Sequence, residues 1–155
     1  MILLNFPEVS FRIRDGLKGT EIFDIIRKKF VALTDEEWVR QNCIAHLINQ
    51  KLYPASLISV EKALKVNGLN KRTDVVVFAN DMKPRMIIEC KAPHIPITNE
   101  VFSQIARYNM TLKVNYLLVT NGIEHYCCWI DFENEKFSFL ESIPDYIEFL
   151  LENGK

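Results

Sequence analysis

The segment between residues 86 and 120 constrains the fold of this chain more than any other. Residues 86–91 are almost entirely apolar until the charges at their end, which is typical of a central strand buried on both faces. Two prolines end this strand, a helix is expected over residues 99–113, and residues 116–120 form a second apolar strand. A strand, a helix and a strand in this order predict a crossover connection, and therefore one parallel pair within an otherwise antiparallel sheet.

The rest of the chain adds a helix at the start and further strands around this unit. Thr34 can cap a helix that runs to about Lys51, and Glu37 completes a capping-box pattern three residues later. Other expected elements are an edge strand at 9–13, one or two helical turns within 21–30, strands 57–61 and 74–78 joined as a hairpin through a turn at Asn67-Gly68, strands 125–130 and 137–140, and a helix at 146–151. The predicted fold class is α/β (α+β), a mixed central sheet flanked by helices.

Size and charge limit the classes of function. A chain of 155 residues with 48% hydrophobic residues can bury one core, so residues 1–155 are expected to form a single domain. A formal net charge of -1 lacks the basic excess of a dedicated nucleic-acid binder. The four cysteines show no CxxC spacing, which argues against structural zinc. No leader and no apolar run of about 20 residues are seen, so the prediction is a cytoplasmic protein without a membrane segment.

An acidic residue two positions before a lysine occurs twice, at Asp81-Met82-Lys83 and at Glu89-Cys90-Lys91. The first pair falls in a turn beside a proline, where the backbone does not hold two side chains on a common face. The second pair falls on a predicted strand, and the two-residue period of a strand places Glu89 and Lys91 on one face. Only the second pair therefore predicts a site.

Asp74 opens the strand that precedes this pair. A hairpin would bring its carboxylate next to Glu89, and two convergent carboxylates are what a hard cation such as Mg²⁺, or Mn²⁺, accepts. In that arrangement Asp74 and Glu89 hold the metal, and Lys91 orients a water or stabilises charge on a phosphate. The predicted chemistry is phosphodiester hydrolysis, and a simple salt bridge is the alternative.

Three accessory residues lie on helices. Glu37 shares a helix face with apolar residues and is a candidate third metal ligand, unless its side chain folds back to the Thr34 amide as a capping box does. Gln104 and Tyr108 lie four residues apart and point the same way, so they could brace Lys91 or a nucleic-acid backbone, or form an ordinary polar rim.

The densest basic run precedes Asp74. It consists of Lys62, Lys65, Lys71 and Arg72. These four residues are the candidates for phosphate contact, with a solvated surface as the alternative.

Several ordered stretches resemble a known family. Residues 36–41, 72–74, 88–93, 104–108 and 118–122 resemble the N-terminal nuclease domain of type I restriction enzyme R subunits. The resemblance runs from about Thr34 to Tyr146, so residues 34–146 are expected to form the nuclease-like core and residues 1–33 an N-terminal extension.

The resemblance implies the PD-(D/E)xK restriction-endonuclease-like fold. Asp74, Glu89 and Lys91 match the three members of its motif, and Gln104 with Tyr108 matches its QxxxY helix motif. It implies Mg²⁺-dependent DNA cleavage of the restriction or defence type, with a motor or specificity subunit as partner. A non-catalytic nucleic-acid or protein interaction module that keeps the nuclease fold is the alternative function, and RNA stays open as a substrate.

Overall fold

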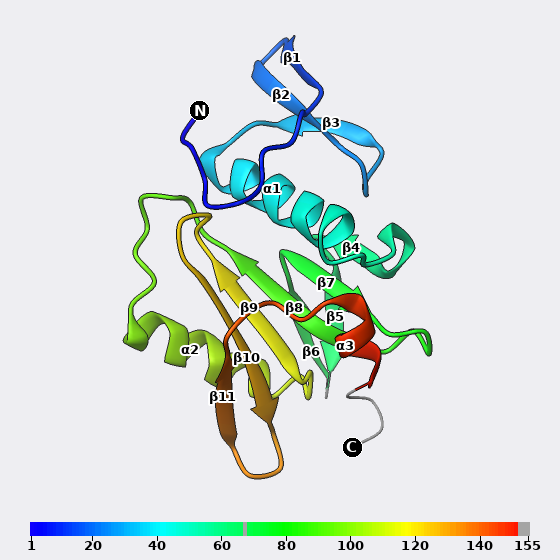
Figure 1. Ribbon diagram of the computed structural model, residues 1–155, viewed down its shortest axis with the longest axis vertical. Helices are drawn as coiled ribbons and strands as arrows, with labels where there is room; N and C mark the ends of the chain where they lie inside the picture. Colours follow the sequence, from blue (N-terminus) through cyan, green and yellow to red (C-terminus); the bar gives the residue numbers. More distant parts are fainter. Residues whose placement is uncertain (67, 152–155) are drawn as a thin grey trace.

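A computed structural model describes residues 1–66 and 68–151, with the backbone alone described for residues 66, 69 and 71. Its centre is a six-stranded sheet in the order β11-β10-β9-β8-β7-β4 (Figure 1). The strands are β4 (Ile58–Val60), β7 (Val75–Phe78), β8 (Pro84–Cys90), β9 (Tyr116–Thr120), β10 (His125–Asp131) and β11 (Lys136–Leu140). The predicted strands 116–120, 125–130 and 137–140 are confirmed within a residue.

The crossover predicted around β8 is confirmed. β8 and β9 pair in parallel, with Glu89 opposite Val119, while β7 pairs with β8 antiparallel. The connection contains α2 (Asn99–Met110), and the Thr98 hydroxyl accepts a hydrogen bond from the Val101 amide at 3.2 Å as its N-cap. β8 lies between β7 and β9 in the interior of the sheet, as its apolar composition predicts.

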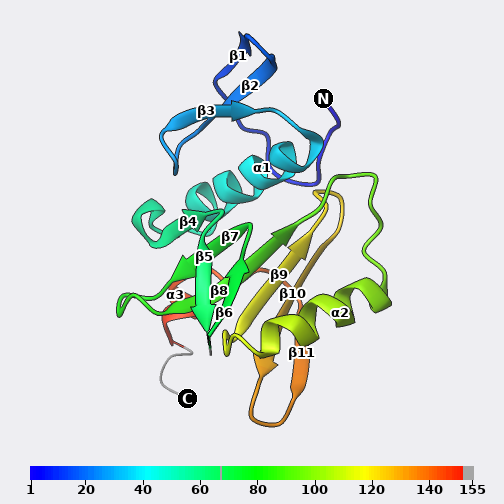
Figure 2. The same ribbon diagram turned by 180° about the vertical axis from the view of Figure 1, so that it is seen from behind.

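The two faces of the sheet are covered by different elements (Figures 1 and 2). α1 (Asp35–Asn49) and α3 (Tyr146–Leu151) cover one face and enclose a first core. α2 and a hairpin of β5 (Ala63–Val66) and β6 (Leu69–Arg72) cover the other and enclose a second core. The first core includes Val39, Ile44, Leu47, Val75, Ile88, Cys90, Leu118 and Phe149, and the second includes Leu64, Val76, Ile87, Phe102, Ala106, Leu112, Val114 and Val119.

The hairpin β5–β6 was not predicted. The expected pairing of residues 57–61 with 74–78 is present as β4 and β7, but the chain between them forms its own pair of strands. Leu64 is buried in the second core, which gives the hairpin an apolar anchor. The predicted turn at Asn67 falls on a residue outside the described part of the chain.

The prediction of helical turns within residues 21–30 is wrong, because a separate three-stranded sheet occupies this region. It consists of β1 (Ile13–Gly16), β2 (Gly19–Asp24) and β3 (Lys29–Ala32), so the predicted edge strand at 9–13 begins only at its last residue. The Asp24 carboxylate accepts hydrogen bonds from the amides of Ile26 and Arg27 and closes a turn there. An Asp that bonds the backbone two residues ahead favours a turn over a helix.

The N-terminal segment runs back across α1 to the turn between β9 and β10. The Asn5 amide donates to the Gly122 carbonyl at 2.7 Å, and the Trp38 indole donates to the Ile2 carbonyl at 3.0 Å. Leu4 is buried in the first core. These contacts join the N-terminal segment to α1 and to the β9–β10 turn.

Within the described residues, every helix is too short or too polar to cross a membrane.

Candidate active site

Asp74 lies one residue before β7, at the edge of the sheet where β8 ends. The antiparallel register pairs Val75 with Ile88, so Asp74 comes opposite Glu89. The Cys90 amide donates to Asp74 Oδ2 at 2.8 Å. The backbone between Glu89 and Lys91 thus holds the Asp74 carboxylate directly.

Strand alternation turns Glu89 away from α1. Its neighbours Ile88 and Cys90 are buried in the first core, whereas Ile87 belongs to the second. Glu89 is half-buried and therefore faces the side of α2, as does its partner Val119. Cys90 thus packs in the opposite layer from Glu89.

Lys91 follows β8 and remains tied to β9. Its amide donates to the Thr120 carbonyl at 2.8 Å, which extends the parallel pairing one residue beyond the strand. Lys91 is half-buried. Asp74, Glu89 and Lys91 are thus brought to one edge of the sheet by two adjacent strands, as predicted.

Arg40 is a member of this site that the sequence did not reveal. It comes from α1, is 4% exposed, and its Nη2 lies 3.3 Å from Asp74 Oδ1. Its Nη1 binds Glu37. Burial alone would lower the pKa of Arg40, but Glu37 and Asp74 raise it above its ordinary value. Asp74 therefore has a guanidinium on one oxygen and a backbone amide on the other.

Glu36 is the acidic residue of α1 that shares the electrostatic environment of the site. Burial, followed by the charge of Asp74, raises the pKa of Glu36, while Arg40 and Lys91 act in the opposite direction. Arg40 Nη2 also lies 3.3 Å from Glu36 Oε1. Glu36 thus shares Arg40 with Asp74, as Glu37 also does.

Glu37 is buried within a cluster of cations. Its carboxylate accepts from Arg27 Nη2 and Gln41 Nε2, both at 2.8 Å, and from Arg40. The Thr34 hydroxyl accepts from the Glu37 amide at 3.0 Å, but the Thr34 amide donates to Ala32. The predicted fold-back of the Glu37 side chain is therefore wrong. A metal at Glu37 would have to displace two guanidinium groups, and this role stays a prediction without support from the geometry.

Arg27 links the three-stranded sheet to the site. It lies in the turn between β2 and β3 and binds Asp24, Glu37 and, at 3.2 Å, Glu61. Asp24 is fully buried; burial would raise its pKa, but hydrogen bonds from Arg27 and the Ile26 amide lower it below the usual value. The N-terminal extension thus contributes charge to the network behind Asp74.

Gln104 and Tyr108 share the outer side of α2. Gln104 is exposed and lines a hollow of about 460 Å³ together with Glu100, Ser103 and Arg107. Tyr108 is 57% exposed. Their common direction is confirmed, and their roles toward Lys91 or DNA stay predictions.

The basic residues before Asp74 that the structure describes have different neighbours. Lys62 lies over the ring of Phe78 at 5.4 Å, and Arg72 binds Glu61 at 2.9 Å. Lys65 lines a cavity at the start of β8. The side chain of Lys71 lies outside the described part of the structure. Phosphate contact by these residues stays a prediction.

The donor set at this edge fits a hard cation. Mg²⁺ in proteins takes one or two carboxylates and completes its octahedron with water and substrate phosphate. Asp74 and Glu89 are two such carboxylates on adjacent strands, although Asp74 contacts Arg40 of α1 whereas Glu89 faces the side of α2. Within the described residues no group of three or more His, Cys, Asp or Glu side chains is arranged around a common point, so a metal here would depend on water or phosphate for its remaining ligands.

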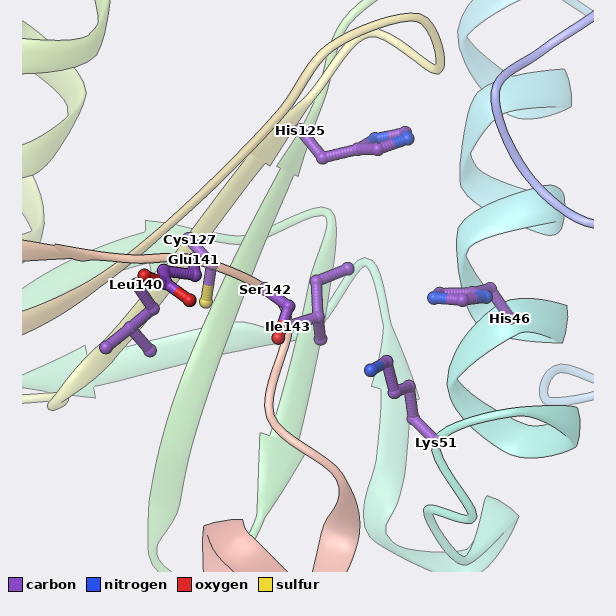
Figure 3. A pocket seen from close by; sticks show the side chains of 8 residues that line it. All are labelled: His46, Lys51, His125, Cys127, Leu140, Glu141, Ser142 and Ile143. Atoms are coloured by element: carbon purple, nitrogen blue, oxygen red, sulfur yellow. The ribbon is translucent and has the colours of Figure 1, made fainter.

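A second pocket lies on the α1 side, between α1 and β10. Figure 3 shows His46 and His125 extending into it from opposite sides, above Lys51. His125 is bonded through Nδ1 to the Thr120 hydroxyl and through Nε2 to the Asn5 carbonyl, both at 2.7 Å. Burial, then Lys51, lowers the pKa of His46. The His125 contacts tie together the N-terminal segment and β9, which is a structural role.

The structure defines an α/β protein with a mixed sheet covered by helices on both faces, and with Asp74, Glu89 and Lys91 at the end of its central strands. Residues 35–144 match the model of the type I restriction enzyme R protein N terminus (HSDR_N). The chain belongs to this family.

Comparison with solved structures and curated proteins adds little. A fragment of a putative HsdR subunit of a type I restriction enzyme from Vibrio vulnificus YJ016 is similar, with 19% identity and a TM-score of 0.44. The match covers 62% of this chain and 20% of that one, so the chain spans about a fifth of the length of that relative. No curated protein matches the chain.

Proposed function

We propose that this domain hydrolyses DNA phosphodiester bonds with Mg²⁺ or Mn²⁺ held by Asp74 and Glu89. The observation that carries the proposal is the 2.8 Å hydrogen bond from the Cys90 amide to Asp74. It fixes the Asp74 carboxylate against the backbone between Glu89 and Lys91. Family membership supports a restriction-type nuclease context.

A bound metal would supply an activated water and polarise the scissile phosphate. Lys91 would place its ammonium against the phosphate oxygens, where it stabilises the charge that develops in the transition state. Arg40 holds Asp74 Oδ1 from the helix side and so limits the rotation of that carboxylate. Gln104 and Tyr108 would act from α2 by positioning Lys91 or the DNA backbone.

Substrate binding would also involve residues outside the sheet edge that holds Asp74, Glu89 and Lys91. Lys62, Lys65, Lys71 and Arg72 are the proposed phosphate contacts on the hairpin side. The net charge of -1 predicts weak binding by the domain alone. A motor or specificity subunit would then hold the DNA, as the restriction-enzyme family context favours.

The test is cleavage of supercoiled plasmid by the purified protein with Mg²⁺ or Mn²⁺. Lys91→Ala and Asp74→Asn should each reduce the rate by about 10²-fold or more, the scale of losing one charge-stabilising group. Asp81→Asn is the matched control, because Asp81 precedes Lys83 with the same spacing but lies in an exposed turn. Equal cleavage by Asp74→Asn and Asp81→Asn, with all proteins folded, would exclude the assignment.

The second candidate function is a non-catalytic interaction module. The position of Arg40 favours it, because a guanidinium already balances the charge of Asp74 without a metal. Calorimetric titration with Mg²⁺ separates the two. A metal site predicts heat of binding that Asp74→Asn abolishes, whereas the interaction module predicts none in either protein.

A further inference from the structure

Four cations line a cavity at the opposite end of β8 from Glu89. The cavity has a volume of about 370 Å³ and lies between hairpin β5–β6, the start of β8 and the segment after α2. Its charged lining consists of Lys65, Lys83, Arg85 and Lys113, and no acidic side chain contributes to it. This cluster is called the basic pocket below.

The charges of the basic pocket are not neutralised by neighbours. Within the described part of the chain none of its four cations forms an ion pair, although the half-buried Arg27 and the buried Arg40 each bind two or more carboxylates. Arg85 Nε is buried and has no hydrogen-bond partner. Four like charges around one cavity repel each other, and an anion in the cavity would remove that repulsion.

The backbone is irregular at two of the four positions. The pairing of β7 with β8 shifts register between Val77 and Phe78, which leaves Arg85 as the extra residue of a bulge. Lys113 has a φ of 54°, in the left-handed region that side chains other than glycine rarely occupy. A bulge redirects a side chain, and strained residues gather at binding sites.

The basic pocket opens on the same face of the sheet as Glu89. Its apolar walls, Leu64, Leu112 and Val114, belong to the core beneath α2 and hairpin β5–β6. Glu89 faces that side by strand alternation. Arg85 precedes Glu89 by four residues, or roughly 13 Å along β8 at about 3.3 Å per residue.

We infer that the basic pocket binds a backbone phosphate of the DNA strand whose scissile bond lies at Asp74 and Glu89, roughly 13 Å away along β8. This inference rests on the proposed nuclease function for its geometry. Of the four residues proposed as phosphate contacts from the sequence, only Lys65 belongs to it. Lys83, Arg85 and Lys113 are separated from Lys65 by 18 or more residues, and only the fold gathers them.

The experiment measures binding without cleavage. A fluorescent DNA duplex of about two helical turns is titrated with protein in EDTA, by anisotropy, at salt concentrations between about 50 and 200 mM. The double variant Lys65→Gln/Lys113→Gln should weaken binding and reduce the slope of log K against log salt by about 1, since the basic pocket binds one phosphate and each lost phosphate contact lowers the slope by about 1. Both side chains are exposed, so the variant should fold.

The matched control is Lys29→Gln/Lys136→Gln, which removes two exposed lysines from β3 and β11. It should bind with the slope of the unaltered protein. An equal slope in both double variants overturns the inference, as does preference for an RNA duplex of the same length. Failure of plasmid cleavage together with the expected change in slope would reject the nuclease proposal and leave the DNA site standing.

Discussion

Replacing Arg40 with methionine tests whether the charge network behind Asp74 is an energetic unit. The substitution keeps an unbranched side chain in a position that is 4% exposed, but removes the guanidinium that binds Glu37 and Asp74. Glu37 is then left buried with Arg27 and Gln41 as its remaining partners. Breaking one side of a buried ion pair typically costs 3–5 kcal/mol, and the two remaining partners place this case at the low end, about 3 kcal/mol.

The measurement is urea unfolding followed by fluorescence of Trp38 and Trp129. With an m-value of about 2 kcal/mol/M, a loss of about 3 kcal/mol lowers the midpoint by about 1.5 M. Arg14→Met is the matched control, because Arg14 binds Glu21 at 2.7 Å with 55% of its side chain exposed. Such a surface pair contributes about 0–1 kcal/mol.

A double variant tests whether Arg40 and Glu37 depend on each other. Arg40→Met combined with Glu37→Leu removes both buried charges, and most of the lost stability should return because an apolar pair does not require buried ions to be compensated. The charge network is not an energetic unit if Arg40→Met lowers the free energy of unfolding no more than Arg14→Met does. The same conclusion follows if the double variant is less stable than Arg40→Met.

Three further predictions concern single groups. The pKa of Asp24 is lowered in the folded protein, so the stability that Asp24 contributes is present above about pH 4, the unfolded pKa, and is lost as the pH falls toward the folded pKa. The difference between the urea midpoints at pH 5 and pH 3 should therefore be smaller in Asp24→Asn than in the unaltered protein. Burial raises the pKa of Cys128 to about 12, so this thiol should resist alkylation at pH 8 in the native protein and react after unfolding, as mass spectrometry would detect. Gly122 has a φ of 85°, and an added Cβ would lie 2.7 Å from Leu4 Cδ2, so Gly122→Ala should cost about 1–3 kcal/mol in thermal unfolding; an unchanged melting temperature would contradict this.

The sequence predicted the central unit because its signals are local. The apolar run of β8, the two prolines after it and the capping residue Thr98 each act within a few residues. They were enough to predict the parallel pairing with β9, which is confirmed, and the common face of Glu89 and Lys91, which stays a prediction. Asp74 followed from the antiparallel partner of the same strand.

The sequence could not predict contacts that depend on long-range packing. Arg40 reaches Asp74 across 34 residues, and no local pattern marks that pairing. Glu36 and Glu37 differ by one position, or about 100° around a helix of 3.6 residues per turn, and the apolar stripe did not resolve which one meets the site. The composition of residues 21–30 favours a helix, but the chain forms a turn at Asp24 instead, and Arg27 stabilises this turn by binding the Asp24 carboxylate.

The contacts of the N-terminal segment have a consequence for how the chain folds during synthesis. Asn5 hydrogen bonds to Gly122 and accepts from His125, and Leu4 packs in the core that β9 helps to build. A ribosome adding about 5–20 residues per second makes Asn5 on the order of ten seconds before its partners exist. The early-made segment, including Leu4, which is buried in the folded protein, therefore stays exposed until the β9–β10 turn leaves the exit tunnel. Chaperone capture of nascent chains should accordingly end only once that turn has emerged.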